Sequence, residues 1–185
     1  DYAHHSEFKA IDLLPQAQRA TFQGIVRADG RVATRNYIGI LSTVNCSATV
    51  VRKIADWFTA ERLADYPNVD GVVSFAHSLG CGMEMTGEPM QLLRRTMAGY
   101  ARHANLAGAL IVGLGCERNQ LKGLMGDESL QTSDQLKTFV MQETGGTRKT
   151  IEAGIEAVKA MLPSANDVHR ETVSASHLCV GLQCG

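Results

Sequence analysis

The sequence lacks an excess of basic residues, because its 18 Lys and Arg are matched by 19 Asp and Glu. Proteins that bind nucleic acid through its phosphates usually carry such an excess, so the charge balance argues against a nucleic-acid partner. No apolar run approaches the roughly 18 residues of a membrane span, and residues 1–10 lack the apolar stretch of a signal peptide. We therefore expect a cytoplasmic protein without a membrane partner.

The sequence also lacks the patterns of a disulfide framework and of a nucleotide site. Its five cysteines are an odd number in a chain without an export signal, which favours reduced thiols. No Gly-x-Gly-x-x-Gly motif follows the first predicted strand, where residues 42–47 read Ser-Thr-Val-Asn-Cys-Ser. We therefore do not expect a nucleotide cofactor.

What is present is enough apolar sequence for one ordinary domain. The chain has 185 residues, 44% of them hydrophobic and 20% charged, which excludes a disordered or low-complexity segment. Residues 1–30 are interpreted as a linker with one short strand over 21–26, and residues 31–185 as a single α/β domain. The polar beginning, and an end that directly follows a strand-like run, favour a fragment of a larger multidomain enzyme.

Short apolar runs alternate with helical patterns along residues 31–185. Strands are predicted over 37–44, 71–76, 109–114, 138–141 and 177–183. Helices are predicted over 47–63, after Pro89, near 120–125, and from 147 to a stop at Pro163. This alternation predicts an α/β fold with an open, mostly parallel sheet of about five strands and helices on both faces, Rossmann-like in arrangement.

Four cysteines directly follow predicted strands: Cys46, Cys81, Cys116 and Cys184. In an open parallel sheet the carboxyl ends of the strands meet at one edge, where ligands bind, so these thiols are predicted to share that edge. Cys179 lies inside the last predicted strand and is interpreted as a core residue. Cysteine is also among the most buried residue types, so spacing alone leaves both a structural role and a ligand role open.

The neighbours of these thiols favour a functional site. Glycines adjoin Cys81, Cys116 and Cys184, and glycine lets the backbone approach a ligand closely. His77 lies four residues before Cys81 on the same predicted edge. A histidine there is more often a hydrogen-bonded structural residue, but beside candidate thiols it also qualifies as a general base or a metal ligand.

Five separated motifs occur in one order along the chain, at 30–36, 43–46, 77–81, 113–117 and 181–185. Together they resemble the altronate dehydratase/galactarate dehydratase family of bacterial sugar-acid hydro-lyases, which also includes a sulfolactate sulfo-lyase subunit. The resemblance runs from about Phe22 to the end of the chain. Residues 113–120, which read Gly-Leu-Gly-Cys-Glu-Arg-Asn-Gln, look closer to altronate-type members.

The resemblance implies that this chain is the middle domain of a larger enzyme. Members of the family dehydrate a hydroxy acid to a 2-keto-3-deoxy acid with the help of divalent iron, and in them this segment is associated with dimer contacts. The resemblance thus implies a small-molecule sugar-acid substrate, the remaining domains of the same enzyme as partners, and a homodimer. We expect the isolated fragment to be inactive.

The reaction implied by the resemblance gives each candidate residue a chemical role. Removing a proton beside a carboxylate and expelling the neighbouring hydroxide requires a base, an acid and stabilisation of the enediolate. A Lewis acid can supply this stabilisation by binding the carboxylate and the leaving oxygen together. His77 is the candidate acid or base, and Glu117 the candidate orienting carboxylate. Thiolates suit divalent iron or an iron–sulfur cluster, so the predicted metal ligands are Cys46, Cys81, Cys116 and Cys184.

Two alternatives stay open. In the first, the domain is a non-catalytic scaffold or dimerisation domain with structural cysteines, and all of the chemistry lies elsewhere in the enzyme. Its dimer would form through an apolar helix face, built either from Trp57 and Phe58 or from Met90, Leu93 and Met97. In the second, the chain is part of a sulfolactate sulfo-lyase.

Overall fold

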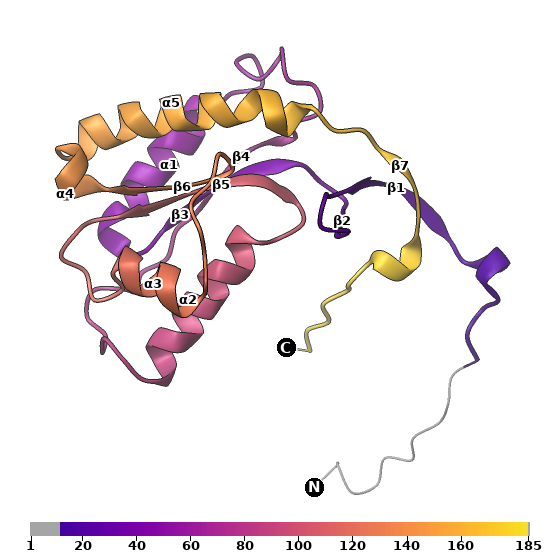
Figure 1. Cartoon of the computed structure of the whole chain (residues 1–185), viewed down its shortest axis with the longest axis horizontal. Coiled ribbons are helices and arrows are strands. Elements are labelled where there is room, and N and C mark those ends of the chain that lie inside the picture. Colours follow the sequence, from indigo (N-terminus) through magenta and orange to yellow (C-terminus); the bar gives the residue numbers. More distant parts are fainter. Residues whose placement is uncertain (1–11, 185) are drawn as a thin grey trace, which may run out of the picture.

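A four-stranded parallel sheet forms the centre of the domain (Figure 1). The computed structural model describes residues 12–184. The strand order of the main sheet is β4 (Gly71–Phe75), β3 (Tyr37–Ser42), β5 (Leu106–Gly113) and β6 (Leu136–Val140). All three neighbouring pairs are parallel, so the carboxyl ends of the four strands lie at one edge.

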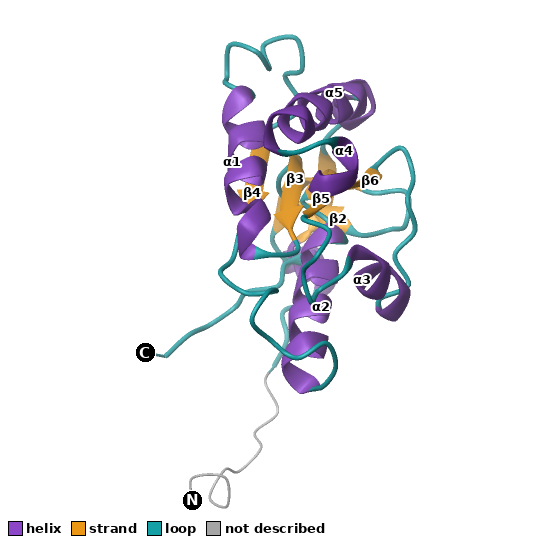
Figure 2. Cartoon of the chain, turned by 90° about the vertical axis from the view of Figure 1, so that its left-hand side faces the viewer, coloured by secondary structure: helices purple, strands orange, loops and turns teal. Residues whose placement is uncertain are grey.

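Helices cover both faces of the main sheet (Figure 2). One face packs against α1 (Ala48–Trp57) and α5 (Thr147–Asn166), which follows the short α4 (Met141–Thr144). The other face packs against α2 (Glu88–Ala101) and α3 (Leu121–Asp127). The predicted α/β class with helices on both faces is therefore confirmed.

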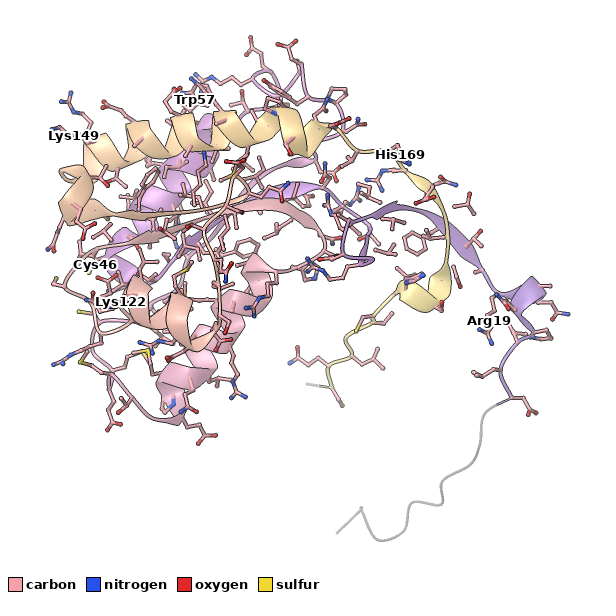
Figure 3. The ribbon with its side chains drawn as sticks, viewed as in Figure 1. Arg19, Cys46, Trp57, Lys122, Lys149 and His169 are labelled. Atoms are coloured by element: carbon pink, nitrogen blue, oxygen red, sulfur yellow. The ribbon has the colours of Figure 1, made fainter. Side chains whose placement is uncertain are left out.

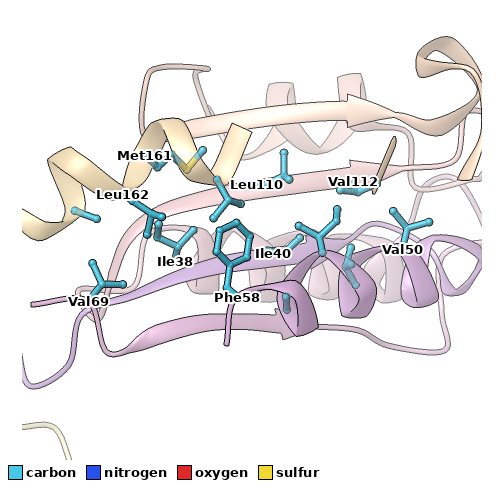
Figure 4. Packing of buried hydrophobic residues seen from close by; sticks show 14 of the residues in the cluster. Ile38, Ile40, Val50, Phe58, Val69, Leu110, Val112, Met161 and Leu162 are labelled. Carbon is cyan, nitrogen blue, oxygen red and sulfur yellow. The ribbon is translucent and has the colours of Figure 1, made fainter. Parts of the chain in front are cut away.

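The central strands are apolar because both of their faces are buried. Ile38, Ile40, Leu110 and Val112 point to the α1 and α5 side, where they form the larger cluster of the core (Figure 4). Their neighbours Leu41, Ala109 and Ile111 belong to the cluster beneath α2 and α3. This alternation explains why β3 and β5 appear in the sequence as continuous apolar runs.

A second, smaller sheet is antiparallel and has the order β2 (Val32–Ala33), β1 (Thr21–Val26) and β7 (Glu171–Ser174). The predicted strand over 21–26 is thus confirmed, while the part of the predicted linker at 1–11 lies outside the described residues. Single 3₁₀ turns occupy η2 (Gln16–Gln18), η3 (Asn45–Ser47) and η4 (Ala175–His177). Within residues 12–184, no helix is long and apolar enough to cross a membrane.

Four predictions about the chain's second half and its helix faces are wrong. Residues 178–183 form no strand and are exposed, because their alternating apolar pattern has no strand beside it among the described residues; Cys179 is exposed with them. α5 continues through Pro163 to Asn166, since a proline this close to a helix end removes only one internal hydrogen bond. Phe58, Met90, Leu93 and Met97 are buried in the domain's own core, so they form no free dimer face.

Asn36 joins the small sheet to the main sheet. Its side chain is fully buried at the amino end of β3. The Nδ2 group donates to the carbonyls of Asn68 and Ala165 at 2.7 and 2.8 Å, and Oδ1 accepts from Arg27 at 2.9 Å. The amide therefore satisfies groups from three segments that are far apart in the sequence.

Replacing Asn36 by Ala is expected to lower the free energy of unfolding by about 2 to 3 kcal/mol, because the buried carbonyls it serves lose their donor. Chemical denaturation of the purified protein measures this change. Gln131→Ala, at an exposed position, is the control and should change stability by no more than about 0.5 kcal/mol. Equal stability of the two variants would contradict the role of Asn36.

Candidate functional site

Three loops meet at the carboxyl edge of the main sheet, and each carries a cysteine. The loop after β3 holds Cys46, and the amide of Asn45 donates to the carbonyl of Leu79, in the loop after β4, at 2.9 Å. The carbonyl of Gly80 accepts from two amides of the loop after β5, Arg118 at 3.0 Å and Asn119 at 3.2 Å. Backbone hydrogen bonds therefore connect the three loops directly.

Gly80 occupies a position that only glycine fits. Its φ is +98°, a conformation that residues with a side chain rarely adopt. A Cβ at this position would also collide with the carbonyl oxygen of Thr43 and with the backbone of Val44. The chain thus lies directly against the end of β3, and this close contact sets the position of Cys81.

Glu117 points into the protein and holds the third loop. Its side chain is 3% exposed. Oε1 accepts from the hydroxyl of Thr43 at 2.9 Å and from the amide of Leu114 at 3.1 Å, while Oε2 accepts from the amide of Gly115 at 2.5 Å. The carboxylate therefore orients the loop that carries Cys116; its predicted action on a substrate stays a prediction.

A second buried polar group, not predicted from the sequence, reinforces the same junction. Asn119 is fully buried and donates to the carbonyl of Thr43 at 3.1 Å, while its Oδ1 accepts from Arg94 of α2 at 3.1 Å. Arg94 also pairs with Asp127 of α3. One feature of the sequence could have indicated this junction: Arg94 directly follows Leu93 on the apolar inner face of α2, where a buried charge needs a partner.

Both ring nitrogens of His77 are engaged by the backbone. Nε2 donates to the carbonyl of Ser42 at 2.8 Å, and Nδ1 accepts from the amide of Leu79 at 3.1 Å. Burial lowers the pKa of His77 below its ordinary value, outweighing the opposing effect of the hydrogen bond to Ser42. The ring is thus held neutral between β3 and the loop after β4, and its predicted acid–base role stays a prediction.

The thiols of Cys46, Cys81 and Cys116 are exposed, so they are accessible at the carboxyl edge. Figure 3 shows Cys46 at the end of the domain opposite to His169, which precedes β7. Cys184 lies beyond β7 in the segment without regular structure, so its expected place at the end of a strand of the main sheet is wrong. Among residues 12–184, no three His, Cys, Asp or Glu side chains gather in a group that could hold a metal ion.

Two cavities adjoin this edge. A polar one of about 590 Å³ is lined by residues 81–86 and Arg118. An apolar one of about 700 Å³ lies between β4 and α2, with Phe75, Leu92 and Tyr100 among its lining and His77 at its border. Only the polar cavity includes one of the edge thiols, Cys81, so we take it as the candidate site.

An open α/β sheet with accessible thiols and a polar cavity at its carboxyl edge has the architecture of an enzyme domain that binds a small molecule. The chain belongs to the D-galactarate dehydratase/altronate hydrolase family, since residues 24–166 match that family's second domain. This match covers the main sheet, all of its helices and the three connected loops.

Individual relatives agree with this assignment. The chain is 31% identical to altronate dehydratase of Bacillus subtilis (strain 168) over 91% of its own length and 33% of that protein. It is 31% identical to altronate dehydratase of Escherichia coli (strain K12), over 100% of this chain and 36% of the relative. It is 33% identical to galactarate dehydratase (L-threo-forming) of the same organism, over 96% and 35%. The chain thus spans about a third of the length of these enzymes.

Lowering the pH from about 7.5 to 5.5 is expected to reduce the free energy of unfolding in part through His77. The unfolded chain, with the ordinary histidine pKa of 6.5, takes up a proton more readily than the folded protein, so stability is lost as the pH falls through this range. His77→Gln should flatten the dependence, because its amide still donates to Ser42 but does not titrate. The exposed His169→Gln is the control and should keep the wild-type slope in urea denaturation; equal slopes for both variants would refute the assignment.

Gly80→Ala is expected to lower the free energy of unfolding by about 2 to 3 kcal/mol, through its positive φ and the collision with Thr43. Gly82→Ala is a matched control in the same loop, because a Cβ there would have nothing within 4 Å. Thermal unfolding compares the two variants. Equal melting temperatures would show that the loops are not held together through Gly80.

Proposed function

We propose that this chain is a domain of a hydro-lyase that dehydrates a sugar acid of the altronate or galactarate type. In this reaction the carbon beside the carboxylate loses its proton and the next carbon loses its hydroxyl group. The resulting enol becomes a 2-keto-3-deoxy acid, and one water molecule is released. The enzyme would be completed by its remaining domains, and the isolated fragment would be inactive.

The observation that carries this proposal is the junction of the three cysteine loops. Hydrogen bonds from Asn45 to Leu79, and from Arg118 and Asn119 to Gly80, join the three loops that carry the exposed Cys46, Cys81 and Cys116. Purely structural cysteines would be expected in the core, whereas these three are exposed beside a polar cavity. The relatives named altronate dehydratase and galactarate dehydratase support the reaction class.

Divalent iron or an iron–sulfur cluster is part of the proposal, with thiolates as suitable ligands. Because no complete metal site is present among residues 12–184, the residues described here do not fit the metal by themselves. Cys46, Cys81 and Cys116 would supply a share of the ligands, and Cys184 would have to reach them from a different part of the fold. Donors from other domains would complete the coordination.

A scaffold or dimerisation role is the second candidate, favoured by the apolar cavity between β4 and α2. Leu79, Leu92 and Tyr100 line it and are 52%, 57% and 45% exposed. A homodimer that covered this face would bury them and would need no chemistry from the thiols. A role in a sulfolactate sulfo-lyase finds weaker support, since the chain is 24% identical to (2R)-sulfolactate sulfo-lyase subunit beta of Chromohalobacter salexigens.

Changing Cys46, Cys81 or Cys116 to Ser in the full-length enzyme is expected to lower its turnover of altronate or galactarate by about tenfold or more. Serine keeps the size of cysteine but is not a soft metal ligand. The stability should change by no more than about 0.5 kcal/mol, because the side chains are exposed. Turnover, bound iron and thermal unfolding are measured on the same anaerobic preparations.

Cys179→Ser is the matched control, because this exposed cysteine lies outside the three connected loops. It should leave turnover and bound iron at their wild-type values. Wild-type turnover in all three edge variants would overturn the catalytic proposal and favour the scaffold role. Turnover of sulfolactate in place of either sugar acid would favour the sulfo-lyase.

A further inference from the structure

We propose that Arg118 binds the carboxylate of the sugar acid and that the polar cavity beside it receives the adjoining hydroxyl groups. The proposal rests on the proposed function and names the residue that would recognise the acid group. It follows from how Arg118 is fixed, from the absence of a partner for its side chain among residues 12–184, and from the composition of the cavity.

The backbone of Arg118 is held on both sides. Its amide donates to the carbonyl of Gly80 at 3.0 Å. The preceding residue, Glu117, is 3% exposed and the following residue, Asn119, is fully buried, and both are hydrogen-bonded inside the protein. Arg118 is thus an exposed residue between two anchors, and its Cα has little freedom to move.

The guanidinium of Arg118 is available for a ligand. Within the described part of the chain it makes no hydrogen bond and no ion pair, and Arg118 is among the residues that line the polar cavity. Several other arginines are already engaged, since Arg94 pairs with Asp127 and Arg27 donates to Asn36. Arg118 is the arginine that lines the polar cavity, among the residues that the structure describes. A guanidinium binds a carboxylate through two parallel hydrogen bonds, which makes it the side chain best suited to an acid group.

The rest of the cavity suits a polyhydroxy acid better than a simple anion. Glu84 can accept hydrogen bonds from hydroxyl groups, and the hydroxyl of Thr86 can both donate and accept. A carboxylate at Arg118 and hydroxyl groups toward Glu84 match the two kinds of polar group in an aldonate. The volume of about 590 Å³ lies within the roughly 300–1,000 Å³ typical of small-molecule sites.

The test is the effect of Arg118→Gln on the full-length enzyme. Removing the charge-assisted pair should raise KM for altronate or galactarate by about 10- to 100-fold, with a smaller change in kcat. Arg118→Lys, which keeps the charge but not the fork, should give an intermediate KM. The melting temperature should not change, because the backbone amide that bonds to Gly80 remains.

Lys122→Gln is the matched control, since it removes one positive charge from an exposed position of the nearby α3 (Figure 3). Lys122 is not among the residues that line the polar cavity. It should leave KM unchanged. Inhibition by an aldonate and by the corresponding alditol, which lacks the carboxylate, separates carboxylate binding from a structural role. Arg118→Gln should weaken inhibition by the aldonate and leave inhibition by the alditol unchanged.

The outcomes separate this proposal from the proposed function. If the wild-type enzyme dehydrates the sugar acid but Arg118→Gln and Lys122→Gln share its KM, the assignment of Arg118 is overturned. If the wild-type enzyme dehydrates no sugar acid, the proposed function fails. In that case, calorimetric titration of altronate and galactarate into the enzyme tests Arg118 separately. The assignment requires that the enzyme binds the sugar acid, that Arg118→Gln loses this binding, and that Lys122→Gln keeps it.

Discussion

The carbonyl of Gly80 accepts two amides from the loop after β5, while the Cα of the same residue lies against the end of β3. The loop after β4 therefore contacts both the end of β3 and the loop after β5. The positions of these three segments depend on one another. Glu117 and Asn119 strengthen the arrangement because the side chains of both are hydrogen-bonded to Thr43. The relative positions of the loops that carry Cys81 and Cys116 depend on this close contact of backbone with backbone.

The edge of the sheet could be predicted from the sequence because it depends on topology. Continuous apolar runs such as 37–44 indicated buried parallel strands, and parallel strands direct their carboxyl ends to one side. Cys46, Cys81 and Cys116 follow three such strands, so their common location required no knowledge of side-chain contacts. The same reasoning failed for residues 177–183, since a strand pattern does not reveal whether another strand lies beside it.

The internal supports of the site could not be predicted in the same way. The sequence predicts Glu117 as an orienting carboxylate, but it does not reveal the three hydrogen bonds that the carboxylate accepts inside the fold. Arg94 and Asn119 meet across α2 and the loop after β5, a contact between residues distant in the sequence. Such partners are set by tertiary packing, whereas periodicity reports only which face of an element is buried.

The small sheet has a consequence for the order in which the chain folds. Thr21 pairs with Ser174, so the pairing of β1 with β7 closes a loop that contains the entire main sheet. The entropic cost of closing so long a loop is high, whereas the β3, β4 and β5 pairings join much nearer segments. During synthesis the main sheet and its thiol edge can thus assemble before β7 leaves the ribosome, and the small sheet then fastens the two ends of the domain.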